Sequence, residues 1–134
     1  MPKQASPTTP TSTALLPDDV SVLALTGEID ATTAQTTRAK ALAAVDAKPA
    51  ALVLDLSGVE FFGSNGIAIV LEAAQRAELR GIRFVVVAHR HVVLRPLQVT
   101  GVDARLTIRP SLTAALDDLH RPTTGIPVAR SGQA

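Results

Sequence analysis

Three short apolar segments constrain the fold of this chain more than any other feature of its sequence. They are Val20–Thr26, Ala51–Leu56 and Arg83–Ala88, and each has the length of a buried strand. Strands that are apolar on both faces are typical of a parallel sheet that is covered by helices on its two sides. The segments therefore predict an α/β fold.

Helical patterns separate these predicted strands. After Ser64, apolar residues recur at helical spacing as far as about Arg80, where Gly81 suits a C-terminal cap. Further helices are expected over 30–47 (capped by Asp30 or Thr32), His91–Val99 and 111–119, and short strands over 14–16 and 104–108. Together these elements predict a mainly parallel sheet of four to five strands covered by about four helices.

The length of the chain, 134 residues, allows one domain with its own core. We expect this domain to span residues 14–120. Residues 1–13 are rich in Pro, Thr and Ser, and 121–134 are similar, so neither has enough apolar surface to offset the entropy of ordering. A flexible segment is therefore expected at each end.

Charge and composition argue against several classes of partner. Thirteen basic and twelve acidic residues are interspersed and give a net charge of +1, and Trp and Tyr are absent, so nucleic-acid binding is not expected. No apolar run approaches the ~20 residues of a membrane span, and the N-terminus lacks the apolar centre of a signal peptide. Cysteine is absent, and His89 and His91 lack further zinc ligands nearby. We expect a cytoplasmic protein without a metal or cofactor.

Two polar segments follow the first two predicted strands. They are Gly27–Asp30 and Asp55–Gly66, and we expect a loop over 57–63 within the second. Right-handed crossovers place the carboxyl ends of parallel strands along one edge of a sheet. Asp30 and Ser64 are therefore expected to lie near each other, provided that the two strands are neighbours.

Ser64 stands at a predicted junction of loop and helix, which gives it two compatible roles. Its hydroxyl can cap the helix by accepting a hydrogen bond from a first-turn amide, worth about 1 kcal/mol. The same amides and the positive end of the helix dipole favour a phosphate, which brings about −1.5 to −2 charges. A phosphorylated Ser64 would thus fit the fold and repel an acidic or apolar partner surface.

The two polar segments resemble the motifs of STAS domains. Gly27-Glu28-Ile29-Asp30 is similar to the family's Gly-Glu-Leu/Ile-Asp motif, and Asp55–Val59 resembles its strand ending. Phe61–Ile67 resembles the phosphorylation loop of the family, usually Phe-hydrophobic-Asp-Ser-Ser-Gly-Leu. The likeness covers roughly residues 18–120 and implies a STAS-like fold.

The resemblance implies an anti-sigma factor antagonist that is not an enzyme. In this family a kinase that is itself an anti-sigma factor phosphorylates the serine, and the unphosphorylated antagonist binds that kinase and frees the sigma factor. The resemblance makes Ser64 the phosphate acceptor and gives a partner-binding surface of Glu28, Asp30, Gly63, Ser64, Asn65 and Gly66, where Gly66 permits a close approach of the backbone. Gly63 replaces the usual Asp and Asn65 the usual second Ser, so the carboxylate beside the acceptor is missing.

Two other functions stay open at this point. A STAS-like chain can be an adaptor or accessory subunit in a signalling or transport assembly without phosphorylation, and Gly63 and Asn65 fit that alternative. A small enzyme or nucleotide-binding domain at the Asp30 edge is the third, although the sequence has no P-loop and no histidine placed to activate Ser64. A receiver domain is excluded because no lysine follows Lys48, so Asp55 is expected to cap a loop.

Overall fold

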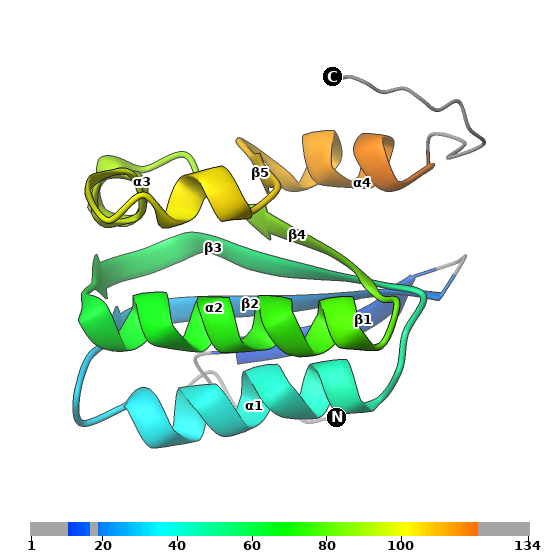
Figure 1. Ribbon diagram of the computed structural model, residues 1–134, viewed down its shortest axis with the longest axis horizontal. Helices are drawn as coiled ribbons and strands as arrows, with labels where there is room; N and C mark the ends of the chain where they lie inside the picture. The colour runs from blue at the N-terminus through cyan, green and yellow to red at the C-terminus, as the bar shows by residue number, and fades with distance from the viewer. Residues whose placement is uncertain (1–10, 17–18, 121–134) are drawn as a thin grey trace, which may run out of the picture.

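The computed structural model describes residues 11–16 and 19–120 of the chain. They form one sheet with strand order β1-β2-β3-β4-β5 and helices on both of its sides (Figure 1). The strands are β1 (Thr11–Leu16), β2 (Val20–Ile29), β3 (Ala51–Phe62), β4 (Arg83–Val87) and β5 (Ile108–Arg109). The helices are α1 (Ala34–Asp46), α2 (Ser64–Leu79), α3 (His91–Val99), α4 (Leu112–His120) and the short 3-10 helix η2 (Val102–Arg105).

The strand pairing confirms the predicted, mainly parallel sheet. Strands β2 to β5 run parallel, and β1 pairs with β2 in the antiparallel direction. Strand β1 begins at Thr11, three residues before the expected start of the domain at residue 14. The remaining parts of the two segments that we expect to be flexible, 1–10 and 121–134, lie outside the described residues.

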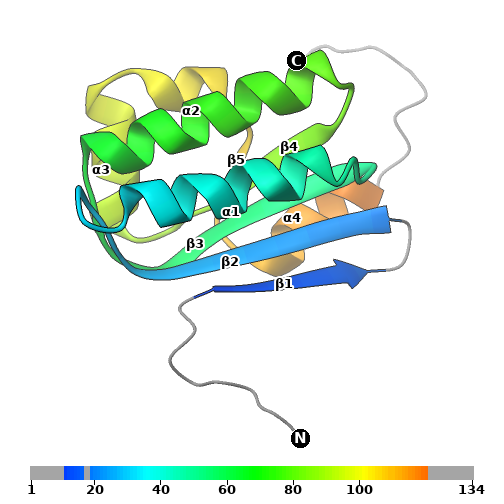
Figure 2. The same ribbon diagram turned by 90° about the horizontal axis from the view of Figure 1, so that it is seen from below.

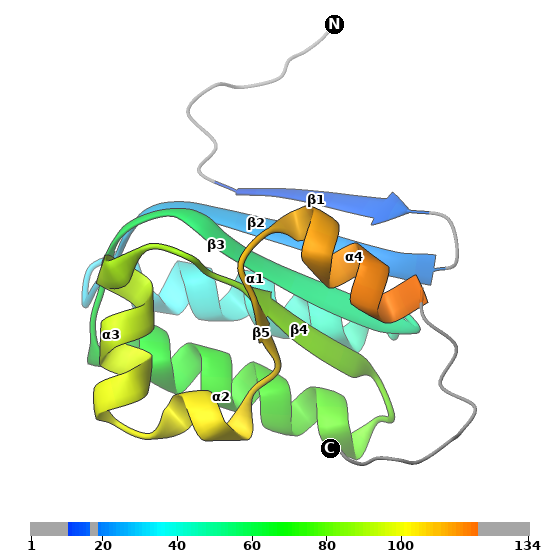
Figure 3. The same cartoon turned by 90° about the horizontal axis from the view of Figure 1, so that it is seen from above.

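The helices form a layer on each face of the sheet. Helices α1 and α2 cover one face and α4 covers the other, while α3 packs at the end of the sheet near the start of α2 (Figures 2 and 3). The side chains of β3 alternate between the two layers: Leu52 and Leu54 pack with α1 and α2, and Val53 packs with α4. Both faces of this central strand are therefore buried, as its apolar sequence predicts.

The two central strands are longer than predicted. Residues 57–62 continue β3, so the loop expected over 57–63 is wrong, and β2 continues through Gly27 to Ile29. The pairing of β2 with β3 is irregular at two points, each a β-bulge with one extra residue on β3. Each bulge breaks the two-residue period by which a strand is recognised in a sequence. Gly58, which directly follows the first bulge, is also typical of turns. For both reasons the sequence pattern indicates a loop over these residues.

The second bulge determines which of two adjacent phenylalanines enters the core. Pairing with β2 passes from Val59 to Phe61 and skips Glu60. An unbroken strand would direct Val59 and Phe61 to the same face. The extra residue instead buries Val59 and Phe62 and leaves Phe61 50% exposed.

The C-terminal part follows the predictions with one correction. Helix α3 has the predicted bounds, and Ser111 caps α4 by accepting the Ala114 N–H at 3.1 Å. The strand expected over 104–108 is largely wrong, because η2 includes residues 104 and 105 and the strand β5 comprises only Ile108 and Arg109.

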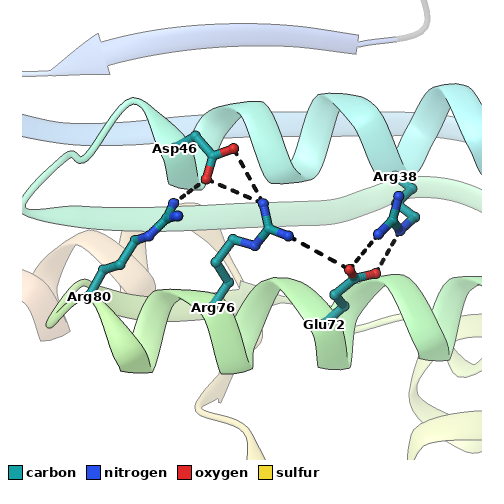
Figure 4. Close-up of polar contacts among 5 residues, drawn as sticks. All are labelled: Arg38, Asp46, Glu72, Arg76 and Arg80. Carbon is teal, nitrogen blue, oxygen red and sulfur yellow. Dashed lines mark hydrogen bonds and ion pairs between the residues drawn. The ribbon is translucent and has the colours of Figure 1, made fainter.

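Arginine and carboxylate side chains link α1 to α2 (Figure 4). Arg38 binds Glu72 through two hydrogen bonds, Nε to Oε1 at 2.7 Å and Nη2 to Oε2 at 2.6 Å. Asp46 at the end of α1 binds both Arg80 and Arg76, the latter at 3.3 Å. The hydrogen bond from Arg38 lowers the pKa of Glu72, and that from Arg80 lowers the pKa of Asp46. Each of these carboxylates therefore stays ionised at neutral pH.

Candidate functional site

The carboxyl ends of β2 and β3 form the edge of the sheet on which the predicted site residues lie. Ile29 at the end of β2 pairs with Phe62 at the end of β3, so Asp30 and Gly63 leave the sheet side by side. Helices α1 and α2 both begin at this edge (Figure 2). The predicted neighbour relation of the two strands is confirmed, and it places Asp30 and Ser64 on one edge.

Asp30 caps the turn that leads into α1. Its Oδ1 accepts the backbone N–H groups of Thr32 at 2.9 Å and Thr33 at 3.2 Å, and the Thr32 hydroxyl at 2.7 Å. In return, Thr33 Oγ1 accepts the Asp30 N–H at 3.0 Å, which completes a reciprocal capping box. The bond from the Thr32 hydroxyl is the main reason that the pKa of Asp30 is lowered. The N-cap of α1 itself is Thr33, so the prediction that Asp30 or Thr32 caps this helix is wrong. Asp30 instead caps the preceding turn, and the Thr32 hydroxyl donates to it.

Ser64 is the first residue of α2 and is exposed. The N-cap of this helix is Gly63, whose carbonyl accepts the Ile67 N–H at 3.1 Å. The prediction that Ser64 is the N-cap is therefore wrong. Because β3 continues to Phe62, only Gly63 is left to join strand to helix, and it takes the cap position. The Ser64 hydroxyl is consequently placed on the surface of the first turn, where capping does not use it.

The two glycines beside Ser64 have different surroundings. A Cβ on Gly66 would lie 2.5 Å from Cε1 of the buried Phe62 ring, so glycine at this position lets that ring pack closely against the helix. A Cβ on Gly63 would lie 3.4 Å from the Phe61 ring, an ordinary contact, and its φ of −112° is open to any residue. The absence of a carboxylate at position 63 is therefore no consequence of backbone geometry.

A groove of about 390 Å³ between α1 and α2 opens beside this edge, and the sequence alone did not indicate it. The half-buried Asn65 lies on its wall, one residue from Ser64. Most of the lining is small or apolar, and it comprises Ala31, Ala34, Gln35, Arg38, Asn65, Ala68, Ile69 and Glu72. The alanines in this lining do not predict a groove from the sequence, because alanine is common in any helix and the groove depends on how the two helices pack.

Other predicted residues have more local roles. Asp55 Oδ1 accepts the Ser57 N–H at 3.0 Å and the Ser57 hydroxyl at 2.6 Å, so the predicted capping role of Asp55 is confirmed, at a bulge rather than in a loop. Glu28 is exposed and pairs with Phe61 across the two strands. Sequence reasoning missed Thr33, although its spacing from Asp30 is that of a capping box.

Within residues 11–16 and 19–120, no group of three or more His, Asp or Glu side chains could hold a metal ion. None of the helices described here is long and apolar enough to cross a membrane.

The fold and this edge define a class of protein. The family model of the STAS domain matches residues 13–115, and the chain belongs to the STAS domain family. The resemblance seen in the sequence motifs and the predicted fold are both confirmed.

Individual relatives sharpen this assignment. The chain is 37% identical over 97 residues to the anti-sigma-F factor antagonist RsfB of Mycobacterium tuberculosis, across 72% of this chain and 79% of RsfB. It is similar to the crystal structure of an anti-sigma factor antagonist from Mycobacterium paratuberculosis, with a TM-score of 0.75 and 34% identity, covering 88% of this chain and 100% of that one. It shares the fold of the phosphorylated form of the Bacillus cell fate determinant SpoIIAA, with a TM-score of 0.63 and 18% identity over 82% of this chain and 99% of that one.

Proposed function

We propose that this chain is an anti-sigma factor antagonist that binds a kinase-type anti-sigma factor through the edge carrying Asp30 and Ser64. Phosphorylation of Ser64 ends this binding. RsfB and the Mycobacterium paratuberculosis protein support the first part, since both are described as anti-sigma factor antagonists. The observation that carries the second part is the exposed position of Ser64 on the first turn of α2, where Gly63 is the cap.

The proposed reaction makes the chain a substrate and not a catalyst. The γ-phosphoryl group of ATP moves to Ser64 Oγ, the hydroxyl proton leaves, and ADP is released by the kinase. The chain itself uses no metal or cofactor in this scheme. The proposed setting is the cytoplasm, where sigma factors act.

The start of α2 suits a phosphate without a change of fold. The first N–H groups of a helix have no partner one turn earlier, and the helix dipole is positive at this end. A phosphate on Ser64 would add about −1.5 to −2 charges there. The core contact between Phe62 and Gly66 lies beneath this surface and stays as it is. The switch therefore acts on the charge of the binding surface and not on the folded state.

The other proposed surface residues contribute in different ways. Glu28 is exposed, and Asp30 and Asn65 are partly exposed, so these three can contact a partner directly. Gly63 leaves the backbone open beside the acceptor. Gly66 is buried and shapes the surface through the core beneath it.

Phosphorylation with intact-mass detection tests this proposal. We would incubate the chain with ATP and each kinase-type anti-sigma factor encoded in the same genome. One phosphate adduct is expected on wild type with the cognate kinase, and none on Ser64→Ala. An adduct that is undiminished in Ser64→Ala, or no adduct with any kinase, would rule out the Ser64 switch. Gly63→Asp, for which the backbone has room, measures how the missing carboxylate affects the rate.

Gly63 also favours a second candidate function, that of an adaptor or accessory subunit which binds its partner without modification. In that function the carboxylate beside Ser64 is absent because no kinase has to recognise it. Partner capture that is unchanged by ATP, together with equal capture by Ser64→Asp, would favour the adaptor over the switch.

A further inference from the structure

Phe61 is an aromatic side chain that the fold turns outward next to the candidate site. It is 50% exposed, whereas the adjacent Phe62 is 3% exposed. The bulge at Glu60 produces this difference, and pairing with Glu28 fixes the backbone of Phe61 in the sheet. Bulges are over-represented beside functional sites, where they redirect a side chain. The outward position of Phe61 is thus built into the strand and is not a property of a loose loop.

The position of Phe61 separates it from the other exposed apolar side chains. Among the described residues, the large exposed ones are Phe61, Leu79 and Val99. Leu79 is the last residue of α2, at the opposite end of that helix from Ser64, and Val99 ends α3. The Phe61 ring lies against the edge itself, 3.4 Å from where a Cβ on Gly63 would be.

Two glutamates adjoin Phe61 in the sheet. Glu28 is paired with Phe61 on the neighbouring strand, and Glu60 precedes it on the same strand. Both glutamates are exposed. The surface that complements an apolar ring with an acidic border is an apolar pocket bordered by Lys or Arg.

We propose that Phe61 is the apolar anchor of the interface with the anti-sigma factor, where its ring fills an apolar pocket bordered by basic side chains. This inference rests on the proposed function. A few buried aromatic residues carry much of the energy of a typical interface. Because the strand already holds Phe61 in place, little conformational entropy is lost when a partner covers it.

The anchor also explains how a phosphate on Ser64 would act. Ser64 follows Gly63, which lies against the Phe61 ring, so the phosphate would stand beside the pocket that closes over the ring. A charged group that enters an apolar contact must lose its water, which is unfavourable even where basic residues border the contact. Phosphorylation therefore weakens binding at the anchor.

Calorimetric titration of the full chain tests the anchor. Each kinase-type anti-sigma factor of the same genome would be titrated, and the one that binds wild type would be used with the variants. Phe61→Ala is expected to raise Kd roughly 30-fold or more, as for an interface hot spot. Leu79→Ala is the matched control, and its Kd should stay unchanged. Glu28→Gln combined with Glu60→Gln is expected to slow association at low salt and to flatten its dependence on NaCl.

The outcomes separate this inference from the proposed function. Equal Kd values for wild type and folded Phe61→Ala overturn the anchor and leave the proposed function intact. If wild type binds none of the factors, the proposed function falls and the anchor falls with it. An unchanged association rate in the double glutamine variant overturns the basic border. Should Phe61→Ala fail to fold, Phe61→Gln, with a polar side chain, decides between the same outcomes.

Discussion

Helices α1 and α2 are held together differently at their two ends. At their carboxyl ends, Asp46 of α1 is bound by Arg76 and Arg80 of α2 (Figure 4). At their amino ends, beside Ser64, a groove of about 390 Å³ with walls that include Ala31 and Ala68 separates them. Arg38 and Glu72 also connect the two helices within the lining of this groove. The small side chains on its walls nevertheless leave the surface beside Ser64 accessible.

The edge of the sheet instead depends on close packing beneath it. Phe62 packs on Gly66 with no room for a Cβ, and Asp30 holds the turn before α1 by local hydrogen bonds. The comparison therefore predicts different responses to substitution. Changes to the core contact should affect stability most, changes to the charged end less, and changes at Ser64 least.

Gly66→Ala is expected to have the largest effect on stability, because it disturbs the edge from within the core. The new Cβ would lie 2.5 Å from Cε1 of Phe62, so the ring or the helix must shift. A contact this short belongs at the upper end of the about 1–3 kcal/mol of overpacking, which exceeds the roughly 1 kcal/mol that alanine gains over glycine in a helix. Urea denaturation should show a free energy of unfolding lower by about 1–2 kcal/mol.

Gly63→Ala is the matched control for this variant. Its Cβ would make an ordinary contact at 3.4 Å, and its backbone conformation suits alanine. Alanine reduces the conformational entropy of the unfolded chain, which stabilises the fold, but it is less favourable than glycine at an N-cap, which destabilises the helix. Because these two effects oppose each other, the free energy of unfolding should stay close to that of wild type. If Gly66→Ala and Gly63→Ala lowered the free energy of unfolding equally, the contact between Phe62 and Gly66 would not be the cause of the effect at position 66.

Asp46→Asn is expected to have a smaller effect, confined to the charged end. It removes the negative charge that binds Arg76 and Arg80 and should lower the thermal midpoint by a few degrees at low ionic strength. Near 1 M NaCl the screening length is about 3 Å, so the difference from wild type should shrink. Binding at the distant edge should be unchanged.

The pH dependence of the same variant gives a second readout. Arg80 and Arg76 lower the pKa of Asp46 below its ordinary 3.8, so the folded chain holds this proton less tightly than the unfolded chain. The stabilisation is fully present above the ordinary pKa and is lost as the pH falls through the lowered one. The difference between wild type and Asp46→Asn should therefore be greatest at neutral pH and vanish in strong acid. A difference that persists unchanged at pH 2 would contradict an electrostatic origin.

The sequence predicts the order of strands and helices because apolar runs such as Ala51–Leu56 directly reflect burial on two faces. It does not predict where β3 ends. Two bulges break the period of the strand, and Ser57 and Gly58 are also common in loops. An error of this kind has a functional consequence, because the end of β3 decides which residue caps α2.

The candidate site was predictable to a similar degree. The motifs place Asp30 and Ser64 on one edge through topology alone, and the pairing of Ile29 with Phe62 confirms this. The groove and the outward turn of Phe61 could not be predicted, because they depend on helix packing and on one extra residue in a strand. The local pattern of apolar residues contains neither kind of information.

Substitutions at Ser64 are expected to have the smallest effect on stability of those compared here. The residue is exposed and Gly63 is the cap, so Ser64→Ala and Ser64→Asp should both stay within about 0.5 kcal/mol of wild type. Binding to the anti-sigma factor should nevertheless separate them, because Ser64→Asp introduces charge beside the interface and Ser64→Ala does not. Calorimetric titration of both variants, with thermal unfolding in parallel, measures the two effects independently.

The pattern of results at Ser64 distinguishes three roles of the edge. A large fall in the midpoint for Ser64→Ala would mean that the hydroxyl supports the fold, contrary to its place on the first turn. Equal binding by wild type and both variants would mean that the edge does not respond to charge, as an adaptor would not. Weaker binding by Ser64→Asp alone, at unchanged stability, is the result that a phosphorylation switch requires. It would also show that a charge at the open end of the helix pair controls the partner without any effect on the charged end.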